Sequence, residues 1–236
     1  MIDGKKVVVV FPAYNAAKTL EKTYNELPFD IVDETILVDD ASKDDTAALA
    51  NRIGVNHVII HDQNRGYGGN QKYGYLWAIE NGMDIVVLLH GDGQYAPEEI
   101  PRMVEPILSN TADVVFGSRM MQRSKAIKGG MPLYKFIGNV CLTSIQNLLT
   151  GVHLSEWHTG YRAYRVRSLT NINFVNNSNA FDFDTQIILQ MIGSNQRIAE
   201  ISIPTFYGQE ISHVNSLKYG MQILGHTLRY RFSQQH

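Results

Sequence analysis

Short apolar runs rich in β-branched residues alternate along this chain with longer amphipathic stretches. The runs cover residues 7–11, 35–38, 57–60, 85–89 and 114–116. A strand that is buried on both faces is apolar at every position, whereas a strand with one solvated face alternates between apolar and polar residues. The pattern therefore predicts an α/β fold in which a mostly parallel sheet carries helices on both faces.

Two of the intervening segments also carry helix signals. Pro97 followed by Glu98 and Glu99 is typical of a first helical turn, and we expect that helix to end near residues 109–110. Residues 182–192 place apolar side chains at helical spacing and stop at Gly193. Residues 197–203 predict one further strand, which the following proline ends.

Composition narrows the class of protein. The 236 residues suit one domain, and a formal net charge of −2 gives no positive field that would attract nucleic acid. The single cysteine, Cys141, excludes an intrachain disulfide and a cysteine-built metal site. The apolar run at residues 7–11 is too short for a signal peptide. We expect a single-domain, cytoplasmic protein that does not bind nucleic acid.

Polar side chains follow several of the expected strands. In an open parallel sheet, ligands bind beyond the carboxyl ends of the strands, so these positions are the candidate site. They are residues 12–15 (Pro-Ala-Tyr-Asn), 39–42 (Asp-Asp-Ala-Ser), 90–94 (His-Gly-Asp-Gly-Gln) and 117–119 (Gly-Ser-Arg). The first half of the chain therefore reads as a nucleotide-binding unit, to which the second half adds the rest of a cleft.

Residues 90–94 are the most informative of these segments. His90, Asp92 and Gln94 alternate, so in an extended turn all three side chains point toward one ion. A carboxylate repels a diphosphate unless a divalent cation lies between them, so this arrangement favours Mg²⁺ or Mn²⁺. The alternative is a tight turn in which Asp92 caps the helix that begins near Pro97.

Two further segments carry less specific signals. Asp40 ends a strand, where an acidic residue can accept hydrogen bonds from a ribose or a base, although turn chemistry accounts for it equally well. Residues 64–70 are rich in glycine and precede a helix, yet they match neither the dinucleotide-binding fingerprint nor the P-loop. We interpret them as a loop that shapes the nucleotide cleft.

A carboxylate and an arginine complete the candidate set. Glu156 lies at the edge of an uncharged stretch and is a candidate general base, while Arg119 could neutralise a leaving diphosphate. The alternative for Glu156 is a surface ion pair with Arg162 or Arg165.

Taken together and in this order, the motifs resemble family 2 of the glycosyltransferases, and within it the polyprenyl-phosphate sugar transferases such as dolichyl-phosphate mannose synthase. The motifs are residues 12–15, 38–44 (Val-Asp-Asp-Ala-Ser-Lys-Asp), 92–94, 117–119 and 159–162 (Thr-Gly-Tyr-Arg). The resemblance covers about residues 5–207. It implies a GT-A fold, an inverting transfer from a nucleoside-diphosphate sugar to a polyprenyl-phosphate or glycan acceptor, and a divalent cation.

The resemblance also implies roles for individual residues and regions. Pro12, Tyr14 and Asp40 would hold the nucleoside, Asp92 and Gln94 would meet the metal and the diphosphate, and Arg119 would line the donor site. Glu156 falls where the family often has aspartate. On this reading the single domain, 1–236, has a donor half at about 1–117, an acceptor half at 118–212 and a C-terminal amphipathic helix at 213–236.

Three departures from the family pattern bear on activity. The usual Asp-x-Asp is His-Gly-Asp at residues 90–92, Ala16 replaces a common glutamate, and residues 209–213 replace a basic cluster. A second function class therefore stays open, namely a catalytically impaired protein that binds nucleotide sugars.

The last helix leaves three alternatives. Residues 214–232 form a basic amphipathic pattern with Lys218, Arg229 and Arg231. Such a helix could rest peripherally on the inner face of a membrane, pack on its own domain or pack on a second copy of the chain in a homodimer.

Overall fold

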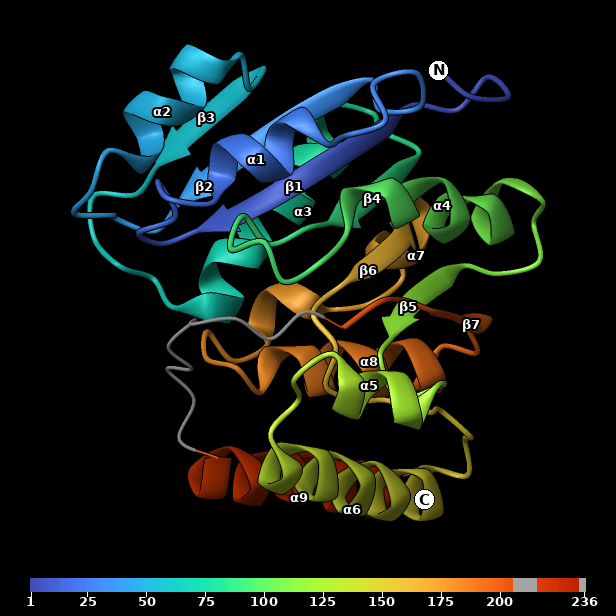
Figure 1. Ribbon diagram of the computed structural model, residues 1–236. Coiled ribbons are helices and arrows are strands. Elements are labelled where there is room, and N and C mark those ends of the chain that lie inside the picture. The colour runs from blue at the N-terminus through green and yellow to red at the C-terminus, as the bar shows by residue number, and fades with distance from the viewer. Residues whose placement is uncertain (206–215, 234–236) are drawn as a thin grey trace.

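The computed structural model describes residues 1–205 and 216–233, and within them the chain forms one seven-stranded sheet (Figure 1). The strand order is β3-β2-β1-β4-β6-β5-β7. The strands are β1 (Val7–Ala13), β2 (Glu34–Asp39), β3 (His57–Ile60), β4 (Ile85–Leu88), β5 (Val114–Ser118), β6 (Arg162–Arg165) and β7 (Ile198–Ser202).

The strands confirm the predicted fold class and add one element that the sequence did not indicate. All of the expected runs form strands, and the pairings β1 with β2, β1 with β4, β2 with β3 and β5 with β7 are parallel. The added strand is β6, which lies antiparallel between β4 and β5, with Ala163 opposite both Val87 and Val115. It escaped prediction because its sequence is Arg-Ala-Tyr-Arg, with no apolar run.

Helices connect and cover the strands. The α-helices are α1 (Leu20–Asn25), α2 (Thr46–Ile53), α3 (Tyr67–Glu80), α4 (Ile100–Leu108), α5 (Arg123–Lys128), α6 (Leu133–Thr150), α7 (Val166–Thr170), α8 (Phe183–Gly193) and α9 (Ser216–Ser233), and the 3₁₀ turns are η1 (Pro97–Glu99) and η2 (Phe174–Asn176). The helix expected after Pro97 begins as η1 and continues as α4, and α8 matches the helix expected at 182–192.

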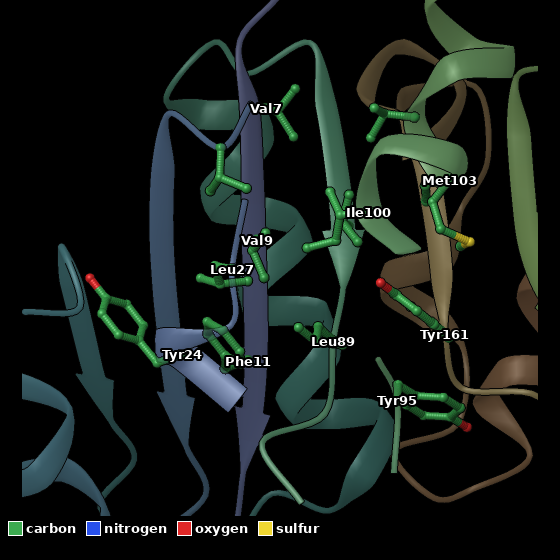
Figure 2. Close-up of a cluster of buried hydrophobic side chains, with 14 of the residues drawn as sticks. Val7, Val9, Phe11, Tyr24, Leu27, Leu89, Tyr95, Ile100, Met103 and Tyr161 are labelled. Atoms are coloured by element: carbon green, nitrogen blue, oxygen red, sulfur yellow. The ribbon is translucent and has the colours of Figure 1, made fainter. Parts of the chain in front are cut away.

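The two faces of the sheet bury separate clusters of side chains. Along β1, Val7, Val9 and Phe11 join a cluster with α1, α2 and α4, and Figure 2 shows these three side chains in a close-up of the cluster. Val8 and Val10 face the opposite way and pack with α3, α7 and α8. Each fully buried aliphatic side chain of this kind stabilises the fold by about 1.5–3 kcal/mol. The expected helices on both faces are therefore confirmed.

Two long helices form an outer layer at one edge of the molecule. In Figure 1, α6 and α9 lie beyond α5 and α8, on the side away from β3. α9 packs against α6 and α8 and buries Gly220, Ile223 and Thr227, so packing on its own domain is confirmed for this helix. Within residues 1–205 and 216–233, none of the helices has the length and apolarity needed to cross a bilayer.

Candidate active site

Three of the predicted segments meet at the carboxyl edge of the parallel strands. The loop after β1 is tied to the loop after β2, because Ser42 Oγ accepts the N–H of Asn15 at 2.8 Å. Thr19, which follows the same β1 loop, donates its hydroxyl to the carbonyl of Gly91 at 2.6 Å. At this edge Pro12 is half-buried and Tyr14 is 45% exposed. The structure thus brings residues 12–15, 39–42 and 90–94 together.

Asp40 organises the glycine-rich loop from a buried position. Its carboxylate accepts the backbone N–H groups of Arg65 at 2.7 Å and Gly66 at 3.0 Å, and lies 3.2 Å from His61 Nδ1. Gly66 has a φ of +84°, a conformation that favours glycine. Direct contact between Asp40 and a nucleoside stays a prediction, and the contacts present are those of a residue that shapes the loop.

Part of the expected glycine-rich loop is helical. α3 begins at Tyr67, so of residues 64–70 only the first three precede the helix. The glycines allow close packing, because a Cβ on Gly68 would lie 2.5 Å from Phe183 Cβ and one on Gly74 would overlap Val10. In the sequence these glycines resemble a ligand-binding loop. In the structure they allow α3 to pack closely against its neighbours.

His90 and Asp92 project from the loop that follows β4. Asp92 is half-buried, and its Oδ1 accepts the backbone N–H of Gln94 at 3.1 Å. The His90 ring lies between the rings of Tyr67 and Tyr95, with centroid distances of 5.5 and 5.8 Å. Burial lowers the pKa of His90, although the charge of Asp92 opposes this shift, so the imidazole is neutral at pH 7.

A buried chain of polar groups supports His90, and sequence reasoning missed most of it. Tyr67 donates its hydroxyl to Asp184 Oδ2 at 2.8 Å, and the same hydroxyl lies 3.4 Å from His90 Nε2. Asp184 in turn lies 3.3 Å from the Nη1 of Arg162, which is fully buried. Burial lowers the pKa of Arg162, but the charge of Asp184 together with smaller contributions from Tyr164 and Tyr67 outweighs this, and the net shift is upward. Asp182 and Asp184, at the start of α8, were a sequence signal for this chain of polar groups. Acidic residues usually occur at that position because they complement the helix dipole.

Glu156 and Arg119 form a buried ion pair. The carboxylate accepts the Arg119 backbone N–H at 2.7 Å and binds its Nε and Nη2, and it also accepts Asn139 Nδ2 at 2.9 Å. Burial raises the pKa of Glu156, but Arg119 outweighs this and holds it below the usual range. The alternative of a surface pair with Arg162 or Arg165 is wrong, because Glu156 is fully buried and those arginines pair with Asp184 and Asp113.

The segment that contains Gly160 packs against the loop that follows β4. Gly160 donates its N–H to Tyr95 Oη at 2.8 Å, and a Cβ at this position would lie 2.8 Å from His90 Nε2. Burial raises the pKa of Tyr95, and the charges of Arg119, Glu156 and Asp92 also act on it. Tyr95 therefore links the loop that carries His90 and Asp92 to the segment that contains Gly160.

A hollow elsewhere on the molecule is not a candidate active site. It is lined by Lys5, Asp84, Asp113 and Arg165, among others, at the amino ends of the parallel strands. Ligands of open α/β sheets bind at the opposite ends. The candidate site is therefore the carboxyl edge.

The comparison with family models decides the class of protein. Residues 8–172 match the model described as Glycosyl transferase family 2. The chain belongs to this family. It is 31% identical over 219 residues to a UDP-N-acetylglucosamine–dolichyl-phosphate N-acetylglucosaminyltransferase of Methanococcus voltae, covering 86% of each chain. It is 29% identical to an undecaprenyl-phosphate mannosyltransferase of Micrococcus luteus, over 87% of this chain and 85% of that protein.

Solved structures confirm the fold. Glucosyl-3-phosphoglycerate synthase from Mycobacterium tuberculosis, in complex with Mn²⁺, uridine diphosphate and phosphoglyceric acid, superimposes with a TM-score of 0.73 at 20% identity. The match covers 97% of this chain and 79% of that one. The predicted GT-A fold is thus confirmed.

Family membership confirms the expected activity class as well. The protein is an inverting glycosyltransferase, and the alternative of a binding protein without catalysis has no better support. Two of the departures from the family pattern, His90 and Ala16, lie among the described residues. Residues 209–213, the third departure, lie outside the described residues.

Proposed function

We propose that this protein transfers a sugar from a nucleoside-diphosphate sugar to a polyprenyl phosphate, with a divalent cation at Asp92. The proposal rests on one observation above all. Tyr95 joins the two halves of the site, because its ring lies 5.8 Å from that of His90, in the loop that carries Asp92, and its hydroxyl accepts the N–H of Gly160, in the segment that follows Glu156. The relatives named for dolichyl- and undecaprenyl-phosphate acceptors support the choice of acceptor.

The donor is assigned to the edge formed by the first four strands. Tyr14 is exposed at the end of β1 and offers a ring against which a base can stack. Pro12 lies beside it, while Asp40 holds the backbone of the loop at residues 64–66. In this proposal residues 1–117 bind the nucleotide sugar, and residues 118–212 supply the acceptor side.

The chemistry of the donor set fits a divalent cation shared with the substrate. Among the residues described, no cluster of three or more histidine, cysteine or acidic side chains could hold a metal by itself. Asp92, His90 and Gln94 offer a carboxylate, a neutral imidazole and an amide, which leaves coordination positions for diphosphate oxygens. When bound, Mg²⁺ or Mn²⁺ would neutralise charge on the departing diphosphate.

The chemical step needs no general base with this acceptor. A phosphate oxygen of the polyprenyl phosphate forms a bond to the anomeric carbon while the bond from that carbon to the nucleoside diphosphate breaks. The electron pair of the broken bond stays on the diphosphate. Because the second pKa of a phosphate monoester is about 6, the attacking oxygen has no proton to lose near neutral pH.

Glu156 is assigned a positioning role rather than the role of a base. Its carboxylate is fully buried and occupied by Arg119 and Asn139, so it does not face an acceptor. The fixed carboxylate orients the guanidinium of Arg119, which we assign to the leaving diphosphate. A hydroxyl acceptor would need a base, and this arrangement does not offer Glu156 for that task.

Transfer of labelled sugar to undecaprenyl phosphate in detergent tests the proposal. Nucleoside-diphosphate sugars are first ranked by thermal stabilisation of the full chain with and without Mn²⁺, because a ligand that binds the native state raises its stability. Asp92→Asn should then lower turnover by about 10²-fold or more while circular dichroism and melting temperature stay unchanged. Full activity of Asp92→Asn, or transfer only to sugar hydroxyls, would contradict the proposal.

A further inference from the structure

Helix α6 exposes large apolar side chains on its outside, whereas the side chains that it buries most deeply are polar. The large apolar side chains on its exposed face are Leu133, Tyr134, Ile137, Ile145 and Leu148, which are 41–83% exposed. The buried face consists of Asn139, Thr143 and Gln146. A helix between a protein core and water has the opposite distribution. The outer face of α6 is therefore suited to an apolar medium.

The inner face of α6 has partners that explain its polarity. Asn139 donates to Glu156 at 2.9 Å, and its side-chain oxygen accepts the hydroxyl of Thr143 at 3.1 Å. Asn147 Oδ1 accepts the indole N–H of Trp157 at 2.8 Å. The helix thus holds the segment that carries Glu156. These contacts account for the inner face only, because none of the described residues covers the outer one.

α9 extends the same outer surface. Its exposed side chains Leu217, Met221, Leu228 and Phe232 are spaced by four, seven and four residues, which places them on one side of the helix. The two helices run parallel, because Gly220 lies beside Leu142 and Gln146 donates to Thr227 further along both. In Figure 1 they form the outermost layer of the molecule. We call the surface formed by α5, α6 and α9 the α6–α9 face.

The charged side chains on these three helices are all basic. The helices α5, α6 and α9 contain no aspartate or glutamate, and residues 114–155 contain none either. Their basic residues are Arg123, Lys125, Lys128, Lys135, Lys218, Arg229 and Arg231. Apolar side chains bordered by lysine and arginine are complementary to the acyl chains and headgroups of anionic lipids.

We infer that the α6–α9 face lies flat on an anionic lipid bilayer. A second copy of the chain is a poorer occupant, because a two-fold contact brings identical basic side chains against one another. This inference goes beyond the proposed function, since it holds whatever the acceptor is. It also places the helix that binds Glu156 at the lipid surface.

Co-sedimentation of the full-length chain with vesicles tests the inference. Binding should be strong to phosphatidylcholine mixed with phosphatidylglycerol, weak to phosphatidylcholine alone, and reduced at high salt. Replacing Ile137 and Leu148 together by serine should weaken binding to the mixed vesicles by about tenfold or more. Replacing Lys125 and Lys128 by glutamine should weaken binding chiefly to the vesicles that contain phosphatidylglycerol.

A matched variant controls for loss of exposed apolar area in general. Ile60 and Val175 are 58% and 49% exposed and lie outside the α6–α9 face. Their replacement by serine should leave vesicle binding at the wild-type level. Melting temperatures of all variants are measured first, since substitutions at exposed positions change stability little.

Three outcomes would overturn the inference. One is failure of the wild-type chain to bind the mixed vesicles, and another is equal binding by the Ile137→Ser, Leu148→Ser variant. The third is a concentration-dependent dimer that this variant dissociates, in the absence of vesicle binding. Transfer to undecaprenyl phosphate in detergent is scored separately, so the proposed function and the membrane surface can fail independently.

Discussion

The two sides of the candidate site are built differently. On the side of β1 and β4, Tyr14 is 45% exposed and Asp92 is half-buried, with few internal partners. On the side that β6 and α6 support, Glu156 and Arg162 are fully buried and bound to charged groups. Removing one partner of a buried ion pair is strongly destabilising, whereas truncating an exposed side chain is not. We therefore expect substitutions on the side of β1 and β4 to change ligand binding alone. Substitutions on the side of β6 and α6 should change both the free energy of unfolding and the positions of the site residues.

Arg119→Met gives the largest expected effect and tests this difference directly. The substitution leaves the carboxylate of Glu156 buried without its cation, so the free energy of unfolding should fall by about 3–5 kcal/mol. Asp92→Asn should change it by less than about 0.5 kcal/mol. Urea unfolding followed by circular dichroism measures both values.

An exposed arginine serves as the control for this comparison. Arg102 pairs with Glu99 but is 56% exposed, so Arg102→Met should cost less than about 1 kcal/mol. Equal losses for Arg119→Met and Arg102→Met would break the proposed contrast between the two sides. A double variant that also changes Glu156 to Gln should recover part of the loss, because it removes the unpaired charge.

The pH dependence of stability gives a second, smaller test. Burial lowers the pKa of His158 to about 4, against about 6.5 in an unfolded chain. Between these values the unfolded chain binds a proton that the folded chain does not. The contribution of His158 to the free energy of unfolding is therefore complete above about pH 6.5 and is lost as the pH falls toward 4, by about 3 kcal/mol.

Replacing His158 by glutamine should remove this part of the pH dependence. Urea midpoints of wild type and His158→Gln at pH 7, 5.5 and 4.5 provide the comparison. As the pH falls across this range, the urea midpoint of the wild type should fall further than that of the variant. A constant difference would mean that the side chain is more solvated than its packing against Tyr219 indicates.

Tyr67→Phe should give the smallest effect, and it tests the residue that lies between the two sides of the site. It removes the hydroxyl that donates to Asp184 and lies near His90, and it should cost about 1 kcal/mol of stability. Because His90 loses a contact that orients it, the ratio of Mn²⁺- to Mg²⁺-supported activity should also change. An unchanged ratio together with the stability loss would limit Tyr67 to a structural role.

The sequence predicted the parallel part of the sheet well and the rest less well. Strands β1, β2 and β4 are buried on both faces, so their apolar runs identify them. β6 is equally buried, but it satisfies its arginines through Asp184 and Asp113, which are distant in sequence. Local patterns do not contain such pairings. The polar inner face of α6 was missed for the same reason, since its partners lie in another segment.

The candidate site shows the same limit. Asp92 was identified because glycines flank it after an apolar run, and Arg119 because it follows a strand. The sequence did not indicate that Glu156 binds Arg119, or that Tyr67 and Asp184 stand behind His90. These contacts join segments that are distant in sequence, and they form around β6, which begins at Arg162 and lies between the two groups of parallel strands.

The position of β6 also determines when this molecule can fold during its synthesis. β4 and β5 are translated first, yet they pair with β6 and not with each other. Until residue 165 has left the ribosome, β4 has an open edge and β5 has no partner, because its other neighbour, β7, is translated later still, and unpaired strand edges promote aggregation. Chaperone capture should therefore fall sharply once β6 has emerged, and a fragment that ends at residue 117 should not remain monomeric.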